Sequence, residues 1–439
     1  MGSRRRSNLG TINRKGVIPL SSPSHSQSSS TEKPNIAAWF RRYSESVHHN
    51  PYPFYSYLLE HEPVRYIEEN GFWVISRYED VNRLLKDPAI GREYRNAMTG
   101  PYEEPPQQVV NEWKPVNDLL ENWMLLRDAP VHTRLRGLVS PAFTPRAMER
   151  LRQNIRGIAE QLADQMAEGK EADLISAFAF PLPVIVIAEM LGVPPEDREL
   201  FKGWSHTFAR ILEGGEQTPD FAGQAIGAAE EITVYFRELI AQRQKAPKDD
   251  MISELLHAKE QADALTEQEL IATCVLLLVA GHETTVNLIS NTMLALLEHQ
   301  ELHARLLSEP TLAATTVEEV LRYESPVQHT SRIALDEIKI GDQTIKQGQY
   351  VTVMLAAANR DPAQFHDPDR FLIDRTPNRH LAFASGAHFC LGAPLARMEG
   401  EIALSVLMQR FPEMRYLDTR PNWRPNMLFR GLGTMQVQL

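Results

Sequence analysis

The sequence predicts a mainly α-helical protein with small β-sheets, folded as a single domain over residues 34–439. Three observations support this class: helical patterns occupy most of the chain, strand-like alternation is confined to short segments, and no repeat or low-complexity linker follows Pro34. Hydrophobic residues make up 43% of the 439 residues, so the chain can bury a core without disulfide bonds.

The predicted elements begin with a strand and a helix and end with a long helix. Residues 71–85 fit a strand followed by a helix, and residues 132–166 fit two helices separated near Pro141 and Pro145. The further segments are helices at 221–245, 266–300, 317–326 and 393–411, and short strands at 333–355 with turns at Gly341 and Gly348.

The helix at 266–300 is expected to cross the interior of the domain. Thr266 and Glu269 have the spacing of a capping box, and the run CVLLLVAG at 274–281 is apolar on all faces. At 1.5 Å per residue such a helix is about 50 Å long. No run of 18 apolar residues occurs, so we expect no membrane anchor.

The N-terminal segment and the rest of the chain have opposite net charges. Residues 1–33 carry a net charge of +5, so the total of −11 leaves −16 on the remaining residues. We expect 1–33 to be a disordered basic, serine-rich extension, although this composition also fits a transit peptide. The acidic body argues against nucleic acid as a partner. Two cysteines far apart in the sequence favour a reducing, cytoplasmic location.

The stretch FASGAHFCLG at 383–392 carries the most informative cysteine, Cys390. A zinc site would need further ligands at close spacing, whereas a catalytic thiol working with His388 stays open. Cys274 lies in an apolar run and fits a buried structural role, but Cys390 lies just before a helix, where backbone N–H groups favour a thiolate. Gly386 and Gly392 allow a large flat group to approach, and an iron porphyrin takes a thiolate as its proximal ligand.

This stretch resembles the haem-binding loop of the cytochrome P-450 family, Phe-x-x-Gly-x-His/Arg-x-Cys-x-Gly. The matching positions are Phe383, Gly386, His388, Cys390 and Gly392, while Ala384 stands where many members have glycine. The resemblance implies that Cys390 is the metal ligand of haem b (iron protoporphyrin IX), with Phe383 and Gly392 beside the cofactor. It places haem between the long central helix and the helix that follows the cysteine loop, and it extends from about Asn50 to the C-terminus. The chain is most similar to soluble bacterial members of the macrolide-hydroxylase and fatty-acyl-oxidase group.

The segment AGHETT at 280–285 interrupts the apolar middle of the central helix. Threonine hydroxyls there can simply bond to carbonyl groups one turn earlier, but a charged Glu283 in such a core is costly unless it is used. The segment resembles the family's oxygen-activating motif, in which Ala280 would lie beside the cofactor. That resemblance implies that Thr284 hydrogen-bonds the bound dioxygen and Glu283 relays protons. His282 is expected to be a scaffold or surface residue.

Further segments resemble parts of the family that hold the cofactor and the scaffold. His132 and Arg136 lie four residues apart, hence on one helix face, and match the family's propionate-binding pair. Arg332 and His388 match the other two propionate contacts. A second set forms the family's structural ion network: the resemblance gives Glu319, Arg322 and, in DPDRF, Arg370.

The resemblance implies a haem-thiolate monooxygenase that activates dioxygen and hydroxylates or epoxidises a hydrophobic small molecule. Only 47 residues follow Gly392, too few for a flavin domain, so a ferredoxin with its reductase, or a flavodoxin, is the expected electron donor. Arg134 and neighbouring arginines up to Arg156 could dock such an acidic donor, or could form a solvated helix face. The alternatives are a peroxide-driven peroxygenase and a haem-binding sensor without turnover.

The substrate itself is not identified by these motifs. By analogy with the family, the pocket is lined by 92–125, residues near 205–235, Leu277–Thr284, Val327–Ile333 and Met427–Phe429, which are largely apolar. Such a lining suits a fatty acid, terpenoid, steroid or macrolide. Arg92 or Arg95 could bind a carboxylate, or either could lie on the surface.

Overall fold

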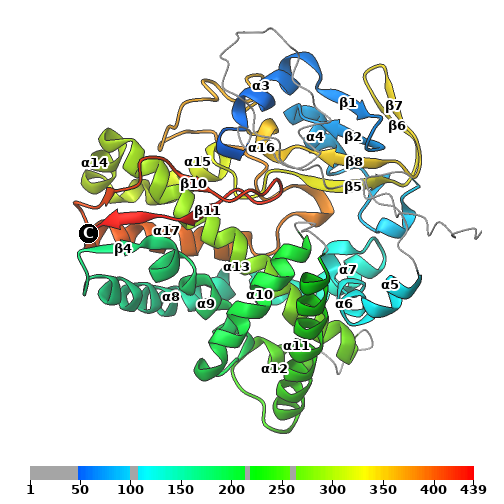
Figure 1. Cartoon of the computed structure of the whole chain (residues 1–439), viewed down its shortest axis with the longest axis horizontal. Helices are drawn as coiled ribbons and strands as arrows, with labels where there is room; N and C mark the ends of the chain where they lie inside the picture. The colour runs from blue at the N-terminus through cyan, green and yellow to red at the C-terminus, as the bar shows by residue number, and fades with distance from the viewer. Residues whose placement is uncertain (1–47, 99–106, 213–217, 258–263) are drawn as a thin grey trace, which may run out of the picture. The chain divides into compact units, whose positions relative to one another are not determined.

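The computed structural model describes residues 48–98, 107–212, 218–257 and 264–439. Every described residue belongs to the compact unit Ile36–Leu439. The predicted disordered extension at 1–33 therefore lies outside the described residues. Among the described residues helices predominate and the strands are short (Figure 1), which confirms the mainly α fold with small sheets.

The helices agree closely with the helical patterns of the sequence. A break after α7 separates it from α8 at Pro141, as predicted, and α11, α13 and α17 fall on the three long helical segments. The α-helices are α3 (Tyr52–His61), α4 (Tyr78–Leu84), α5 (Gln107–Glu112), α6 (Lys114–Leu120), α7 (Val131–Val139), α8 (Pro145–Met166), α9 (Pro181–Leu191), α10 (Arg198–Leu212), α11 (Pro219–Lys245), α12 (Met251–His257), α13 (Glu267–Glu298), α14 (Gln300–Ser308), α15 (Ala313–Tyr323), α16 (Leu355–Ala358) and α17 (Ala393–Arg410).

The largest sheet has the strand order β1-β2-β8-β5-β3, with β2 and β8 parallel and the other pairs antiparallel. The predicted turns at Gly341 and Gly348 are present, and both glycines have a positive φ. The strands are β1 (Val64–Ile67), β2 (Phe72–Ile75), β3 (Ile90–Gly91), β4 (Glu171–Asp173), β5 (Thr330–Ala334), β6 (Ile338–Ile340), β7 (Gln343–Ile345), β8 (Tyr350–Val353), β9 (Arg415–Tyr416), β10 (Asn422–Trp423), β11 (Leu432–Thr434) and β12 (Gln436–Gln438).

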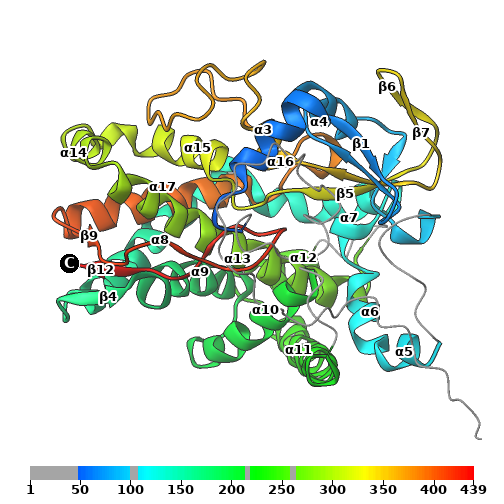
Figure 2. The ribbon, with the colours of Figure 1, turned by 45° about the horizontal axis from the view of Figure 1, so that its top comes forward.

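Helix α13 is the interior helix that the sequence predicts. The Thr266 hydroxyl accepts the N–H of Glu269 and the Glu269 carboxylate accepts the N–H of Thr266, so both halves of the capping box form. The helix packs against α9, α10, α15 and α17, and Figures 1 and 2 show it running between them. By length and composition α13 alone could cross a membrane among the described helices, but 83% of its most apolar window is buried inside the protein.

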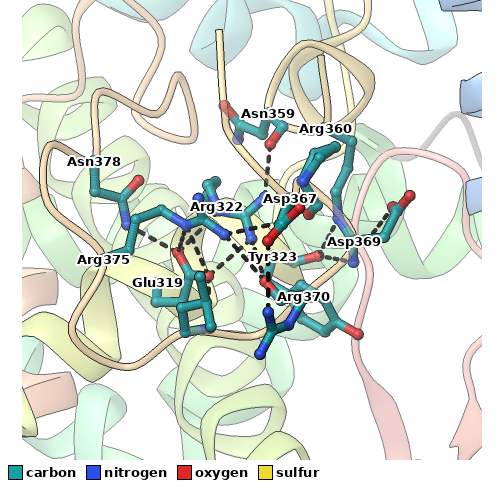
Figure 3. A network of polar contacts seen from close by, with 12 residues as sticks. Glu319, Arg322, Tyr323, Asn359, Arg360, Asp367, Asp369, Arg370, Arg375 and Asn378 are labelled. Atoms are coloured by element: carbon teal, nitrogen blue, oxygen red, sulfur yellow. Dashed lines mark hydrogen bonds and ion pairs between the residues drawn. The ribbon is translucent and has the colours of Figure 1, made fainter. Parts of the chain in front are cut away.

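A buried carboxylate on α15, that of Glu319, fixes the irregular segment that leads to the cysteine loop (Figure 3). Glu319 and Arg322 are both fully buried, and two nitrogen–oxygen contacts of 2.8 Å join them. Arg375 donates from Nε to both carboxylate oxygens at 3.1 and 3.0 Å. The N–H of Leu372 and the side-chain amide of Asn378 add two further hydrogen bonds at 2.9 and 3.1 Å.

The prediction that Arg370 completes this network is wrong. Its guanidinium is exposed and contacts Asp367 at 3.5 Å, and only its backbone carbonyl joins the network, as an acceptor for Arg322 and Arg375. Arg375, five residues later, binds Glu319 instead. Figure 3 shows the Arg375 side chain at Glu319.

The neighbouring carboxylate, Glu318, joins α15 to α17 and to the segment just before the cysteine loop. Arg397 on α17 donates to it at 2.6 and 3.0 Å, and the His380 ring lies at 3.1 Å. Burial raises the pKa of Glu318, but His380 and Arg397 outweigh it and hold that pKa at about 2. The cysteine loop is therefore anchored from both of its flanks.

Replacing Arg375 should destabilise the protein far more than replacing Arg370. Arg375→Gln leaves the buried Glu319 carboxylate with one guanidinium, and breaking a buried ion pair costs about 3–5 kcal/mol. Arg370→Gln removes an exposed contact and should cost less than about 1 kcal/mol. Denaturant unfolding of the two variants measures both values, and equal losses would contradict the assignment of Arg375 to the network.

Candidate functional site

A cavity of about 600 Å³ lies between α13 and the cysteine loop. Its walls are mostly apolar, with a cationic cluster on one side. The lining includes the predicted site residues Cys390, Thr284, Ala280, His132, Arg136, Arg332, His388, Phe383 and Gly392, together with Arg92, Tyr94, Leu125, Leu212, Leu277, Val327, His329, Glu399, Met427 and Phe429. Parts of the substrate-pocket prediction at 99–106 and 213–217 lie outside the described residues.

The loop that carries Cys390 is held in a tight, closed conformation. The N–H of Cys390 donates to the carbonyl of Phe383 at 2.9 Å. Gly386 has φ of 73°, and a Cβ there would collide with the carbonyl oxygen of Leu85, so only glycine fits. Ala384 also has a positive φ, of 57°, at the position where many family members have glycine.

The Cys390 sulfur is in an environment where burial and hydrogen bonding compete. Burial raises the pKa of the thiol above its usual value, while backbone hydrogen bonds from Gly392 and Ala393 and the charges of Arg136 and Arg397 lower it. The N–H groups at the start of α17 are thus available to a thiolate, as the sequence predicted.

Helix α13 presents Ala280 and Thr284 to the cavity, and the burial of the helix is interrupted there. The Thr284 hydroxyl donates to the Ala280 carbonyl at 2.9 Å. The ordinary interpretation of this threonine, a bond to the preceding turn, is therefore correct for the side chain as it stands. Thr284 also lines the cavity, so the same side chain is bonded to its own helix and accessible from the cavity.

Glu283, the second residue expected to be catalytic, does not line the cavity. Its buried carboxylate forms an ion pair with Arg424, which also donates to Asn287 at 3.0 Å. His282 is fully buried with a 2.7 Å contact from its Nδ1 to Ser205, so a surface position for it is wrong and the scaffold role is correct. Burial lowers the pKa of His282 to about 4.

The four predicted propionate partners converge on one wall of the cavity. The rings of His132 and His388 lie 4.0 Å apart, and Arg136 donates to the carbonyl of Phe389 at 2.7 Å. Burial, followed by the nearby His132, Arg332, Arg92 and Arg136, lowers the pKa of His388 to about 2. The cavity wall is therefore strongly electropositive.

These features fit haem b. In the described part of the chain, none of the guanidinium groups of Arg92, Arg136 and Arg332 pairs with a carboxylate, although each lines the cavity. The two propionates of haem are anions that such groups bind. Gly392 has a negative φ, and a Cβ there would meet no protein atom within 4 Å, so the space above it is open to a planar group.

Of three further polar residues of the cavity, His329 and Arg92 fall within the predicted lining ranges 327–333 and 92–125, whereas Glu399 was not predicted. Glu399 on α17 is buried beside Thr285, and burial raises its pKa to about 8. His329 has a buried Nδ1 without a partner among the described residues, and burial lowers its pKa to about 4. Arg92, which the sequence left open, lines the cavity, while Arg95 is exposed and paired with Glu93. A polar residue inside an apolar helical pattern is the signal that could have pointed to Glu399.

Comparison with known proteins shows the family of this chain. A family model described as Cytochrome P450 matches residues 220–429. The chain is 41% identical to the polyketide biosynthesis cytochrome P450 PksS of Bacillus subtilis (strain 168), over 91% of this chain and 98% of that protein. It is also 41% identical to the mycinamicin IV hydroxylase/epoxidase of Micromonospora griseorubida, over 86% of this chain and 92% of that protein.

A solved structure with the same fold is that of P450BioI in complex with hexadec-9Z-enoic acid ligated acyl carrier protein. Its TM-score is 0.83 at 40% sequence identity, and the match covers 90% of this chain and 100% of that one. The predicted fold family is thereby confirmed over nearly the whole described chain.

Glu399 should make the protein less stable as the pH rises. Its pKa is raised in the folded state, so between about pH 4.5 and pH 8 the unfolded chain releases a proton that the folded protein keeps. Stability is then lost through this window as the pH increases. Glu399→Gln should flatten the dependence, measured as free energy of unfolding at several pH values. Glu401→Gln, on the same helix but partly exposed, is the control and should leave the slope as in wild type.

Proposed function

This chain belongs to the cytochrome P450 family and is a haem-dependent monooxygenase, and we propose that it hydroxylates or epoxidises a hydrophobic small molecule with electrons from a separate protein donor. The observation that carries the proposal is the mostly apolar cavity of about 600 Å³ that has Cys390 on one wall and Thr284 on another. We further propose that residues 34–439 form the haem domain and that the protein is cytoplasmic.

A hydrophobic substrate is supported by the side chains around Thr284. Leu277, Val327, Met427 and Phe429 contribute apolar surface, as ligand pockets usually do. One similar protein is named for polyketide biosynthesis, and one similar structure is a complex that carries a fatty acid, so both names refer to hydrophobic molecules. Another relative is named a hydroxylase/epoxidase, which supports the type of reaction.

Haem, held through Cys390 and through the cationic wall, supplies the activation of dioxygen. The chain contributes a hydroxyl at Thr284 that can donate into the cavity once it leaves the Ala280 carbonyl. It contributes a carboxylate at Glu283 that Arg424 holds outside the cavity lining. Positioned proton delivery is the role that we propose for this pair. A proton carried by Glu283 must reach Thr284 by rotation of the carboxylate away from Arg424, or through water.

An acidic ferredoxin or flavodoxin is the donor that we propose. Of the six arginines in the basic stretch 134–156, Arg134 pairs with Glu269 and Arg136 faces the cavity. Arg152 and Arg156 are paired with glutamates. Arg146 and Arg150 are exposed on α8 and carry no ion pair with any described residue. Since α8 packs on α17 and begins two residues after the cavity residue Phe143, they are the better docking candidates, and docking by Arg134 itself stays a prediction.

Removing the Thr284 hydroxyl should uncouple oxygen consumption from product formation. In Thr284→Ala, product formed per oxygen consumed should fall roughly tenfold or more, because a positioned proton donor is lost. Oxygen electrode and product analysis with a ferredoxin system measure the ratio. Thr292→Ala is the matched control, since its hydroxyl makes the same type of bond, to Leu288 at 2.7 Å, away from the cavity.

The same measurements separate the other functions. A haem-binding sensor would show no product in wild type and no effect of Thr284→Ala, and this outcome would contradict the proposal. A peroxygenase would turn over as fast with hydrogen peroxide alone as with the ferredoxin system. The carbon-monoxide difference spectrum of each variant shows that the Cys390 ligation is intact before activity is compared.

Charge reversal at Arg146 and Arg150 should slow reduction by an acidic donor. The double variant Arg146→Glu/Arg150→Glu should lose about tenfold or more in the bimolecular reduction rate at low salt, and less at high salt, because screening weakens the steering. Stopped-flow reduction of the haem protein measures this rate. Lys245→Glu, an exposed charge at the end of α11, is the control. Equal rates for both variants would exclude this surface as the docking site.

A further inference from the structure

Arg92 is held at the cavity wall by a rigid backbone. It follows β3, whose Gly91 pairs with Ile333 of β5. The Asp128 carboxylate accepts the N–H groups of Arg92 and Glu93 at 2.7 and 3.2 Å. A Cβ at Gly91 would press against the Asp128 carboxylate, so the close approach of the two segments requires glycine. The backbone position of Arg92 is therefore fixed.

The guanidinium groups of Arg92 and Arg332 lie side by side. Both donate from Nη1 to the same two acceptors: Arg92 to the Thr330 hydroxyl at 2.9 Å and the Ser331 carbonyl at 2.7 Å, and Arg332 to these atoms at 3.0 and 2.8 Å. Arg92 also donates from Nε to the carbonyl of Leu125 at 3.0 Å. A shared pair of neutral acceptors thus holds two like charges together.

In the described part of the chain, no carboxylate pairs directly with these two guanidinium groups. The exposed fractions of Arg92 and Arg332 are 7% and 3%. Burial, then the charge of Arg92, lowers the pKa of Arg332, and the nearby Asp128 only partly offsets this. Two adjacent buried cations are costly unless an anion joins them.

We propose that Arg92 and Arg332 together form a binding site for one carboxylate at the cavity wall. Each guanidinium has Nη2 without a hydrogen bond among the described residues, and both side chains line the cavity. One donor from each of two adjacent guanidinium groups can bind the two oxygens of one carboxylate. A haem propionate is the favoured source, because both arginines line the same cavity as Cys390 and His388. A carboxylate on the substrate has the same chemistry, and the experiment below separates the two.

The inference adds a third guanidinium to the two that the sequence assigned to the cofactor. It rests on the proposed function only through the presence of haem. Haem transfer and haem reduction potential can be measured without substrate or turnover, so a failure to find monooxygenase products would leave the inference standing. A merely structural role for Arg92, as a link between β3 and β5, would change neither the potential nor the preference between charged and neutral ligands.

The test uses the haem-loaded full chain with Arg92→Gln and Arg92→Lys, and Arg95→Gln as control. Arg95 is three residues away, exposed, and outside the cavity lining. Haem transfer to apomyoglobin, the haem reduction potential, and the Soret-shift affinities for palmitic acid and its methyl ester are measured for each variant. If Arg92→Gln does not fold, Arg92→Lys, which keeps the charge but loses the planar fork, carries the test with smaller effects in the same direction.

Binding of a haem propionate predicts haem transfer about tenfold faster in Arg92→Gln, the size expected of one charge-assisted hydrogen bond, and a more negative reduction potential. The ratio of acid to ester affinity should stay as in wild type. If the carboxylate belongs to the substrate, haem transfer is unchanged and that ratio falls about tenfold. If haem transfer, potential and ratio all match those of Arg95→Gln, the carboxylate site does not exist.

Discussion

The buried carboxylate of Glu319 is the interaction on which the position of the cysteine loop depends. A carboxylate removed from water is destabilising unless charge and hydrogen bonds replace the lost solvent, and Arg322 and Arg375 supply both. Each arginine then has N–H groups left over, and these bind backbone carbonyls of the irregular segment. The carbonyls belong to Asn359, His366, Asp367, Pro368 and Arg370. These bonds make a segment with almost no regular secondary structure rigid. The rigid segment in turn fixes the position of the cysteine loop that follows it.

Much of the fold and the centre of the site could be predicted because their signals are local. The capping box at Thr266, the prolines between α7 and α8 and the glycine turns at 341 and 348 each act within a few residues. The loop around Cys390 is likewise a short pattern. The strands β9–β12 were not predicted, since they are only two or three residues long, and β12 pairs with β4 across a large sequence distance.

The positions that the sequence could not predict have the same physical origin. An irregular segment has no period, so nothing local distinguishes Arg370 from Arg375, and only the folded chain shows which guanidinium reaches Glu319. Similarly, the position of Glu283 next to Thr284 indicates their helix but not which face each side chain takes. One residue along a helix turns the side chain by about 100°, which here places Thr284 at the cavity and Glu283 at Arg424.

That separation explains how a helix buried along nearly its whole length can carry polar chemistry. A hydroxyl inside an apolar helix needs an acceptor at all times, and the Ala280 carbonyl provides it to Thr284 from the same helix. Glu283 needs a cation, and Arg424 provides it from a segment between β10 and β11. The hydroxyl of Thr284 can change its acceptor without disturbing the core, because this bond lies within one helix. The Glu283–Arg424 pair, in contrast, joins α13 to the segment between β10 and β11. The network at Glu319 joins α15 to the irregular segment before the cysteine loop through both side-chain and backbone groups. The protein is thus rigid behind the cysteine loop, whereas Thr284 on α13 can change its hydrogen-bond partner, as the proposed proton delivery requires.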